Sequence, residues 1–210
     1  MAFEKLFNEL YAVVMLKYFW KPYVADFIKE ESPDWVSHTL GLGMEVSQAL
    51  LQQDGEAQKF IELYLGKRRE EIPQSAMERY EEQDGYARRA QYRFAKKLEK
   101  LNRNYTAYLY NGLYLFLHTD RPQPEEIAEL AESMRLGQQQ QQRQFRYVFL
   151  DCITRLYIAD FEHNSCCVDS IEIPEGARRY MQKQTQVLRQ ASEWEKGTVF
   201  AEVEAQLEQI

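Results

Sequence analysis

The sequence has few cysteines and no long apolar segment, and both absences exclude classes of protein. Its 210 residues include three cysteines, Cys152, Cys166 and Cys167, which are too few for a disulfide framework and lack the spacing of a zinc site. We therefore expect a reduced, cytoplasmic protein whose cysteines act as small buried apolar residues. No apolar run reaches the roughly 18 residues of a membrane-spanning helix. Residues 1–10 carry acids early and no small-residue cleavage site, so we expect neither a signal peptide nor a membrane partner.

Basic residues are also in deficit. The formal net charge is −7 and the isoelectric point is near 5.2. A protein that coats nucleic acid non-specifically neutralises phosphates with clustered Lys and Arg, so this balance argues against that class. It leaves open a nuclease with a local basic strip, because an acidic metal site contributes negative charge of its own.

Several catalytic signatures are missing as well. The sequence contains no G-x-x-x-x-G-K-[ST] phosphate-binding loop and no readable Ser-His-Asp or Cys-His arrangement. Its three histidines, His38, His118 and His163, lie far apart, and none forms the i, i+4 helical pair of a zinc protease. We therefore interpret the histidines as ordinary polar residues.

What the sequence does contain is enough apolar surface for one domain. Hydrophobic residues make up 45% of the chain and aromatic residues 13%, so a sizeable core can form. The length suits a single domain, with a polar and mostly helical extension over about residues 175–210.

Apolar periodicity and the positions of Gly and Pro predict alternating helices and strands. The predicted helices cover 3–20, 23–29, 48–65, 86–105 and 124–134, and the predicted strands cover 34–37, 42–46, 109–117, 145–150, 156–161 and 168–173. This order is typical of an α/β fold with a mixed central sheet flanked by helices on both faces.

Two acidic residues in the first pair of strands are the strongest candidates for chemistry. Asp34 follows a proline, and Glu45 stands within the apolar run Met44-Glu45-Val46. A hairpin would bring both carboxylates to one edge of the sheet, where Mg²⁺ or Mn²⁺ takes one or two carboxylates together with waters and a phosphate oxygen. Alternatively, Glu45 points to solvent, and Asp34 is an ordinary turn residue of the kind that often follows proline.

These residues carry a resemblance to a known family. Glu9 on the first helix, Pro33-Asp34, and Gly43-Met44-Glu45-Val46-Ser47 resemble the PD-(D/E)XK, or restriction-endonuclease-like, nuclease superfamily. They also resemble small uncharacterised bacterial proteins with a PD(F/W)…G(I/M)EV(T/S) pattern. The resemblance implies a restriction-endonuclease-like core and Mg²⁺-dependent hydrolysis of phosphodiester bonds in DNA. It also implies Asp34 and Glu45 as metal ligands, Glu9 as a helical acid that orients water, and a homodimer.

One departure from the family pattern concerns positive charge. The usual lysine, two residues after the second acid, falls at Ser47, and a serine supplies no cation to stabilise a transition state. A lysine could come instead from the basic helix, where Lys96, Lys97 and Lys100 are candidates. The alternative is a non-catalytic interaction or nucleic-acid-binding protein whose site is degenerate.

The basic helix over 86–105 is also a candidate nucleic-acid contact. Its cations Arg93, Lys96, Lys97 and Lys100 are interleaved with aromatic residues. Positive charge along one helix can follow a phosphate backbone, although a charged helical face is more often simply solvated.

Overall fold

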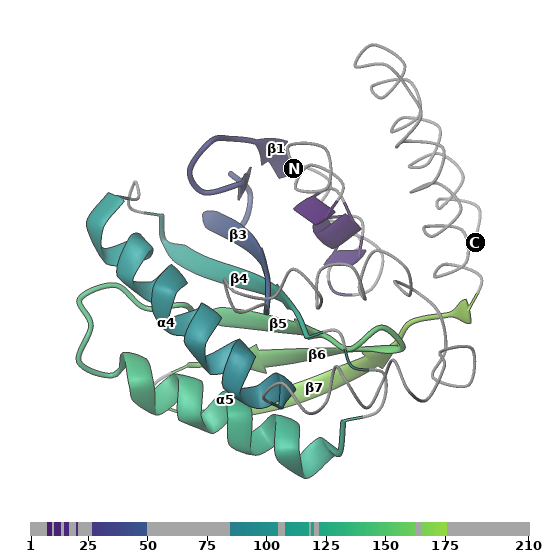
Figure 1. Cartoon of the computed structure of the whole chain (residues 1–210). Coiled ribbons are helices and arrows are strands. Elements are labelled where there is room, and N and C mark those ends of the chain that lie inside the picture. Colours follow the sequence, from purple (N-terminus) through teal and green to yellow (C-terminus); the bar gives the residue numbers. More distant parts are fainter. Residues whose placement is uncertain are drawn as a thin grey trace, which may run out of the picture.

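A mixed sheet forms the centre of the computed structural model, which describes residues 8, 9, 11–13, 15, 16, 20, 27–49, 85–104, 108–117, 119, 122–162 and 165–175 (Figure 1). Seven strands in this part of the chain lie side by side in the order of the sequence. They are β1 (Phe27–Lys29), β2 (Trp35–Ser37), β3 (Leu42–Gln48), β4 (Tyr110–Phe116), β5 (Tyr147–Asp151), β6 (Arg155–Asp160) and β7 (Cys167–Glu172).

The direction of each strand follows from the length of its connection. Strands β1, β2 and β3 are antiparallel neighbours, as are β5, β6 and β7. The β2–β3 turn closes tightly through Gly41, whose φ of 60° suits a residue without a side chain. Strands β3, β4 and β5 run parallel, because the segments that join them are long enough to contain crossover helices.

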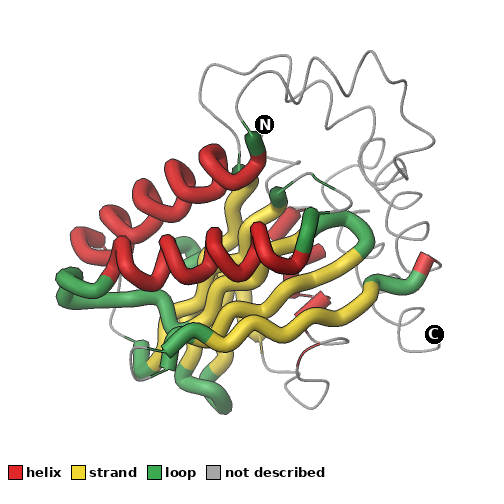
Figure 2. The backbone as a smooth tube through the Cα atoms, turned by 90° about the horizontal axis from the view of Figure 1, so that it is seen from below, coloured by secondary structure: helices red, strands yellow, loops and turns green. Residues whose placement is uncertain are grey.

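Two helices cover one face of this sheet. Helices α4 (Tyr86–Asn104) and α5 (Pro124–Gln138) lie next to each other across the strands (Figure 2). The apolar side of α4, which includes Phe94, Leu98 and Leu101, packs with Leu113 and Leu115 of β4 in one buried cluster. Burial of each such side chain contributes about 1.5–3 kcal/mol relative to exposure, so the crossover helices are held mainly by this face.

The other face packs against the N-terminal segment. The described residues between 8 and 20 are helical, and this segment lies across the sheet from α4 and α5 (Figure 1). Met15 and Leu16 join Met44, Tyr114 and Phe149 in a second buried cluster. The mixed sheet with helices on both faces is therefore confirmed for the described residues.

Most of the predicted elements that fall on described residues are confirmed, with errors at the end of one predicted helix and the start of another. The predicted helix over 23–29 is wrong at its end, because Phe27–Lys29 form β1 and pair with β2. Three residues carry too little periodicity to identify a strand, and this one forms only where β2 offers an edge. Of the predicted helix 48–65, Gln48 belongs to β3, and residues 50–65 lie outside the described residues, as does nearly all of the extension over 175–210.

Two glycines provide a matched test of the packing around β3. A Cβ atom on Gly43 would lie 2.7 Å from Cδ2 of Tyr108 and 2.9 Å from Cγ of the Pro33 ring, whereas a Cβ on Gly137 would meet nothing within 4 Å. We expect Gly43→Ala to lower the free energy of unfolding by about 1–3 kcal/mol through overpacking. Gly137→Ala, near the end of α5, should raise it by up to about 1 kcal/mol through helix propensity. Denaturant titration measures both, and equal stability of the two variants would contradict the described packing.

Candidate functional site

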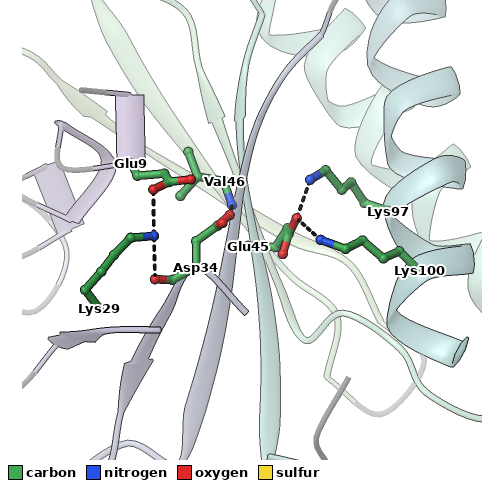
Figure 3. Close-up of polar contacts among 7 residues, drawn as sticks. All are labelled: Glu9, Lys29, Asp34, Glu45, Val46, Lys97 and Lys100. Carbon is green, nitrogen blue, oxygen red and sulfur yellow. Dashed lines mark hydrogen bonds and ion pairs between the residues drawn. The ribbon is translucent and has the colours of Figure 1, made fainter. Parts of the chain in front are cut away.

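Asp34 stands where β2 and β3 separate. The last backbone pair between these strands joins Trp35 to Met44, so the N–H of Val46 lies beyond the paired region. This N–H donates instead to Oδ2 of Asp34 at 2.8 Å (Figure 3). The Asp34 side chain is 1% exposed, so a carboxylate replaces the missing strand partner inside the protein.

Glu9 reaches Asp34 from the N-terminal helical segment. It is 3% exposed, although a glutamate on the surface of a helix is the ordinary expectation. The pKa of the Asp34 carboxyl is raised, first by burial and also by the charge and hydrogen bond of Glu9, while the Val46 N–H and the Lys97 ammonium act in the opposite direction. Two buried carboxyl groups thus lie side by side, and a nearby positive charge would stabilise their ionised forms.

Lys29 supplies part of that charge. Its Nζ lies 2.6 Å from Oε2 of Glu9 and donates to the backbone carbonyl of Asp34 at 3.1 Å. The ammonium also lies 5.4 Å from the centre of a ring of Trp35, the residue paired with Lys29 across β1 and β2. A single lysine on the edge strand therefore ties the helical acid to the start of β2.

Glu45 has different partners. Its carboxylate points toward α4, where Oε1 accepts hydrogen bonds from Lys97 and, at 3.2 Å, from Lys100 (Figure 3). The two lysines are three residues apart and so share one face of the helix. The side chain of Glu45 is 2% exposed, against 17% for Lys97 and 40% for Lys100. The interpretation of Glu45 as a solvent-facing residue is therefore wrong.

The predicted site residues are thus gathered into two adjoining clusters. In Figure 3, Glu9, Lys29 and Asp34 lie on one side of β3, and Glu45 lies with its lysines on the other. The structure brings Glu9 to Asp34, and it brings Glu45 to Lys97 and Lys100. The effect of Lys97 on the pKa of Asp34 links the clusters electrostatically.

The Glu9–Asp34 pair has suitable chemistry for a divalent ion. Among the residues that the structure describes, no three His, Cys, Asp or Glu side chains are grouped to hold a metal. Mg²⁺, however, commonly binds through one or two carboxylates, with water and substrate completing its shell. The carbonyl of Val46 points to the same strand edge as its N–H, because both groups of a strand residue face the same neighbour. The Val46 carbonyl therefore faces the same strand edge as the Asp34 carboxylate.

The remaining predicted residues are placed as follows. Ser47, two residues after Glu45 on β3, faces the same side as Glu45 and is half-buried. Arg93 is half-buried, and burial lowers the pKa of its guanidinium. Lys96 is 55% exposed and lies 4.0 Å from Glu99. Of the four cations predicted to contact nucleic acid, Lys97 and Lys100 therefore form ion pairs with Glu45, and Lys96 faces solvent.

The structure shows the degree of burial of all three cysteines and of one of the three histidines. Cys152 is buried as predicted, but Cys167 is exposed and Cys166 is half-buried, so the buried role predicted for this adjacent pair is wrong at Cys167. The pair falls at the start of β7, a strand with mostly exposed side chains. His38 is exposed, and His118 and His163 lie outside the described residues.

A further buried acid, which the sequence pattern did not single out, lies at the end of β5. Oδ2 of Asp151 accepts a hydrogen bond from the hydroxyl of Tyr114 at 2.5 Å, and Oδ1 accepts one from the N–H of Ile153 at 2.9 Å. Burial raises the pKa of Asp151 to about 6, although both hydrogen bonds act to lower it. An acid that ends the apolar run Phe149-Leu150 was the available signal.

Comparisons with known proteins leave the chain without an assigned family. No family model matches it, and neither a curated protein nor a solved structure matches it. Within the described residues, no helix has the length and apolar character needed to cross a membrane.

The ion pair between Glu45 and Lys97 should show strong energetic coupling. Lys97→Met leaves Glu45 buried with Lys100 as its remaining lysine, so we expect a loss of about 2 kcal/mol in unfolding free energy. The double variant Glu45→Gln/Lys97→Met should lose at least about 1 kcal/mol less than the sum of the single changes. The exposed pair Lys96 and Glu99, treated in the same way, should couple by less than about 0.5 kcal/mol. Additivity at Glu45 and Lys97 would contradict the described contact.

Asp151 should make stability depend on pH. Because its folded pKa of about 6 exceeds the unfolded value of 3.8, the folded state binds the proton more tightly, and stability falls as pH rises through this window. Over the roughly two pH units between these pKa values, the free energy of unfolding falls by about 3 kcal/mol. Asp151→Asn should therefore gain about that much stability relative to the unmodified chain between pH 4 and pH 7. A constant difference across this range, measured by denaturant unfolding, would show that the carboxyl is not perturbed.

Proposed function

We propose that this protein is a divalent-metal-dependent nuclease with a restriction-endonuclease-like core that hydrolyses phosphodiester bonds in DNA. The observation that carries the proposal is the placement of Lys97. The sequence lacks the family's lysine at position 47, and a lysine from α4 reaches Glu45 instead. Three buried acids and their lysines thus flank the middle of β3 in two clusters, where the resemblance implies a catalytic centre.

The contacts divide the work between the two clusters. Asp34 and Glu9 form the acidic pair, so we assign the divalent ion to them, with the Val46 carbonyl as a further oxygen. Glu45, which the resemblance implies as a metal ligand, holds Lys97 in place. A bound Mg²⁺ or Mn²⁺ would lower the pKa of a coordinated water and neutralise charge on the phosphate. In this proposal the Lys97 ammonium, which approaches from the α4 side of β3, would stabilise the negative charge that develops on the phosphate during attack.

A non-catalytic interaction protein is the second candidate function. It is favoured by one observation, namely that lysines already neutralise the acids on both sides of β3. A site whose charge is compensated without a metal can be retained for its structure alone.

Cleavage assays on plasmid and oligonucleotide DNA with Mg²⁺ or Mn²⁺ test the nuclease proposal. We expect Asp34→Asn and Lys97→Met each to lower the rate by at least about 100-fold, the cost of removing one group that stabilises the transition state. Arg103→Met is the control on the same helix, and it should stay within about threefold of the unmodified protein because Arg103 is 72% exposed and pairs with the exposed Glu99.

Metal binding separates the assigned roles. By calorimetry, Asp34→Asn should lose Mn²⁺ binding, whereas Glu45→Gln should keep it and still cleave poorly. Cleavage that survives both Asp34→Asn and Lys97→Met would remove the assignment. A folded protein that cleaves no DNA with either ion would favour the non-catalytic alternative.

A further inference from the structure

Lys29 occupies an unusual position for a lysine on an edge strand. It is the last residue of β1, and its side chain is 39% exposed, yet its ammonium reaches a glutamate that is 4% exposed. The contacts to Glu9 at 2.6 Å and to the Asp34 carbonyl at 3.1 Å place the charge against the acidic pair (Figure 3). Lys29 is thus a cation that enters this cluster from solvent.

The ammonium and a divalent ion cannot both use the same oxygen of Glu9. Mg²⁺ binds oxygen ligands at about 2.0–2.1 Å, so an ion on Oε2 would lie in the space that the ammonium fills and would repel it. Of the two charged partners, Lys29 is the one that can leave. Its head is partly exposed on a flexible four-carbon stem, whereas Glu9 and Asp34 are buried.

We propose that Lys29 is an internal counter-ion that competes with the divalent metal for the Glu9–Asp34 pair. In the absence of metal, its ammonium neutralises the acids and joins β1 to the N-terminal helical segment. Metal binding displaces the ammonium to solvent, so the observed metal affinity is lower than the acidic pair alone would give. This inference rests on the proposed function, since it takes the Glu9–Asp34 pair as the metal site.

The second cluster shows that this arrangement is specific to Lys29. Lys97 and Lys100 are bound to Glu45 on the other side of β3, whereas Lys29 contacts Glu9 and the backbone carbonyl of Asp34. The 5.4 Å contact of the Lys29 ammonium with the Trp35 ring holds it near the acids when no metal is bound. Removal of Lys29 therefore unmasks the acidic pair without disturbing the cation at Glu45.

Calorimetric titration with Mn²⁺ at constant pH and ionic strength tests the competition. Lys29→Met keeps the apolar stem and removes the charge, and we expect it to bind Mn²⁺ at least about tenfold more tightly, since one opposing charge near buried carboxylates is lost. Lys29→Arg keeps the charge and should bind no more tightly than the unmodified protein. Lys96→Met, which removes an exposed charge 4.0 Å from the exposed Glu99, should leave the affinity unchanged. Equal or weaker binding by Lys29→Met overturns the proposal.

Thermal unfolding provides a second readout that does not depend on activity. Without metal, Lys29→Met should unfold at a lower temperature than the unmodified protein, and Mn²⁺ should raise its midpoint by more. Adding Asp34→Asn to Lys29→Met should abolish the enhanced binding; enhanced binding that persists would place the ion elsewhere and overturn the inference.

The results also distinguish this inference from the proposed function. Tighter Mn²⁺ binding by Lys29→Met, in a protein that cleaves no DNA, supports the counter-ion and removes the nuclease. Normal cleavage that depends on Asp34, with unchanged affinity in Lys29→Met, supports the nuclease and removes the counter-ion.

Discussion

The hydrogen bond from the Val46 N–H to the Asp34 carboxylate is the contact on which the rest of the site depends. It forms where the backbone pairing of β2 and β3 ends, and it satisfies a buried donor that would otherwise cost about 1–3 kcal/mol. The same contact fixes the carboxylate in a buried position beside Glu9, and the pKa of Asp34 is raised first by this burial and then by Glu9. The Asp34 side chain therefore does two things at once: it pairs the Val46 N–H, and it adds a second buried carboxyl group beside Glu9.

Burial of the three carboxyl groups of Glu9, Asp34 and Glu45 lowers the stability of the folded protein, and this cost bears on their role. Burial of a charge is costly unless a partner lies close, and here Lys29 reaches one cluster while Lys97 and Lys100 reach the other. Apolar residues at these positions would fold with less electrostatic cost. Perturbed and paired acids in such a place are typical of functional sites, although ion-pair networks also produce them.

Much of the fold could be predicted from the sequence, because apolar periodicity marks strands β2 to β7 and both crossover helices. Strand β1 could not be predicted, because a segment of three residues forms a strand only where it can pair with the edge of β2. The choice of Lys97 was partly readable. It lies three residues after Phe94 and four before Leu101, so the buried stripe of α4 already turns it toward the sheet, whereas Lys96 faces away. The burial of Glu9 carried no such signal, because its partners Lys29 and Asp34 come from distant segments.

The topology explains why acids and cations meet at β3. A parallel crossover from β3 to β4 must carry α4 over one face of the sheet, and alternation along β3 turns Glu45 toward that face and Val46 toward the other. The N-terminal helical segment, with Glu9, covers the second face. Asp34 lies with Glu9 on the side of the N-terminal segment, and its carboxylate also binds the backbone edge of β3 through the N–H of Val46. At that edge Asp34 lies beside Glu9 from one layer, and the charge of Lys97 from the other layer acts to lower its pKa. Under the proposed function, a cation held there by Asp34 would be attracted by Glu9 in one layer and repelled by Lys97 in the other, so its binding would depend on the separation that the sheet imposes.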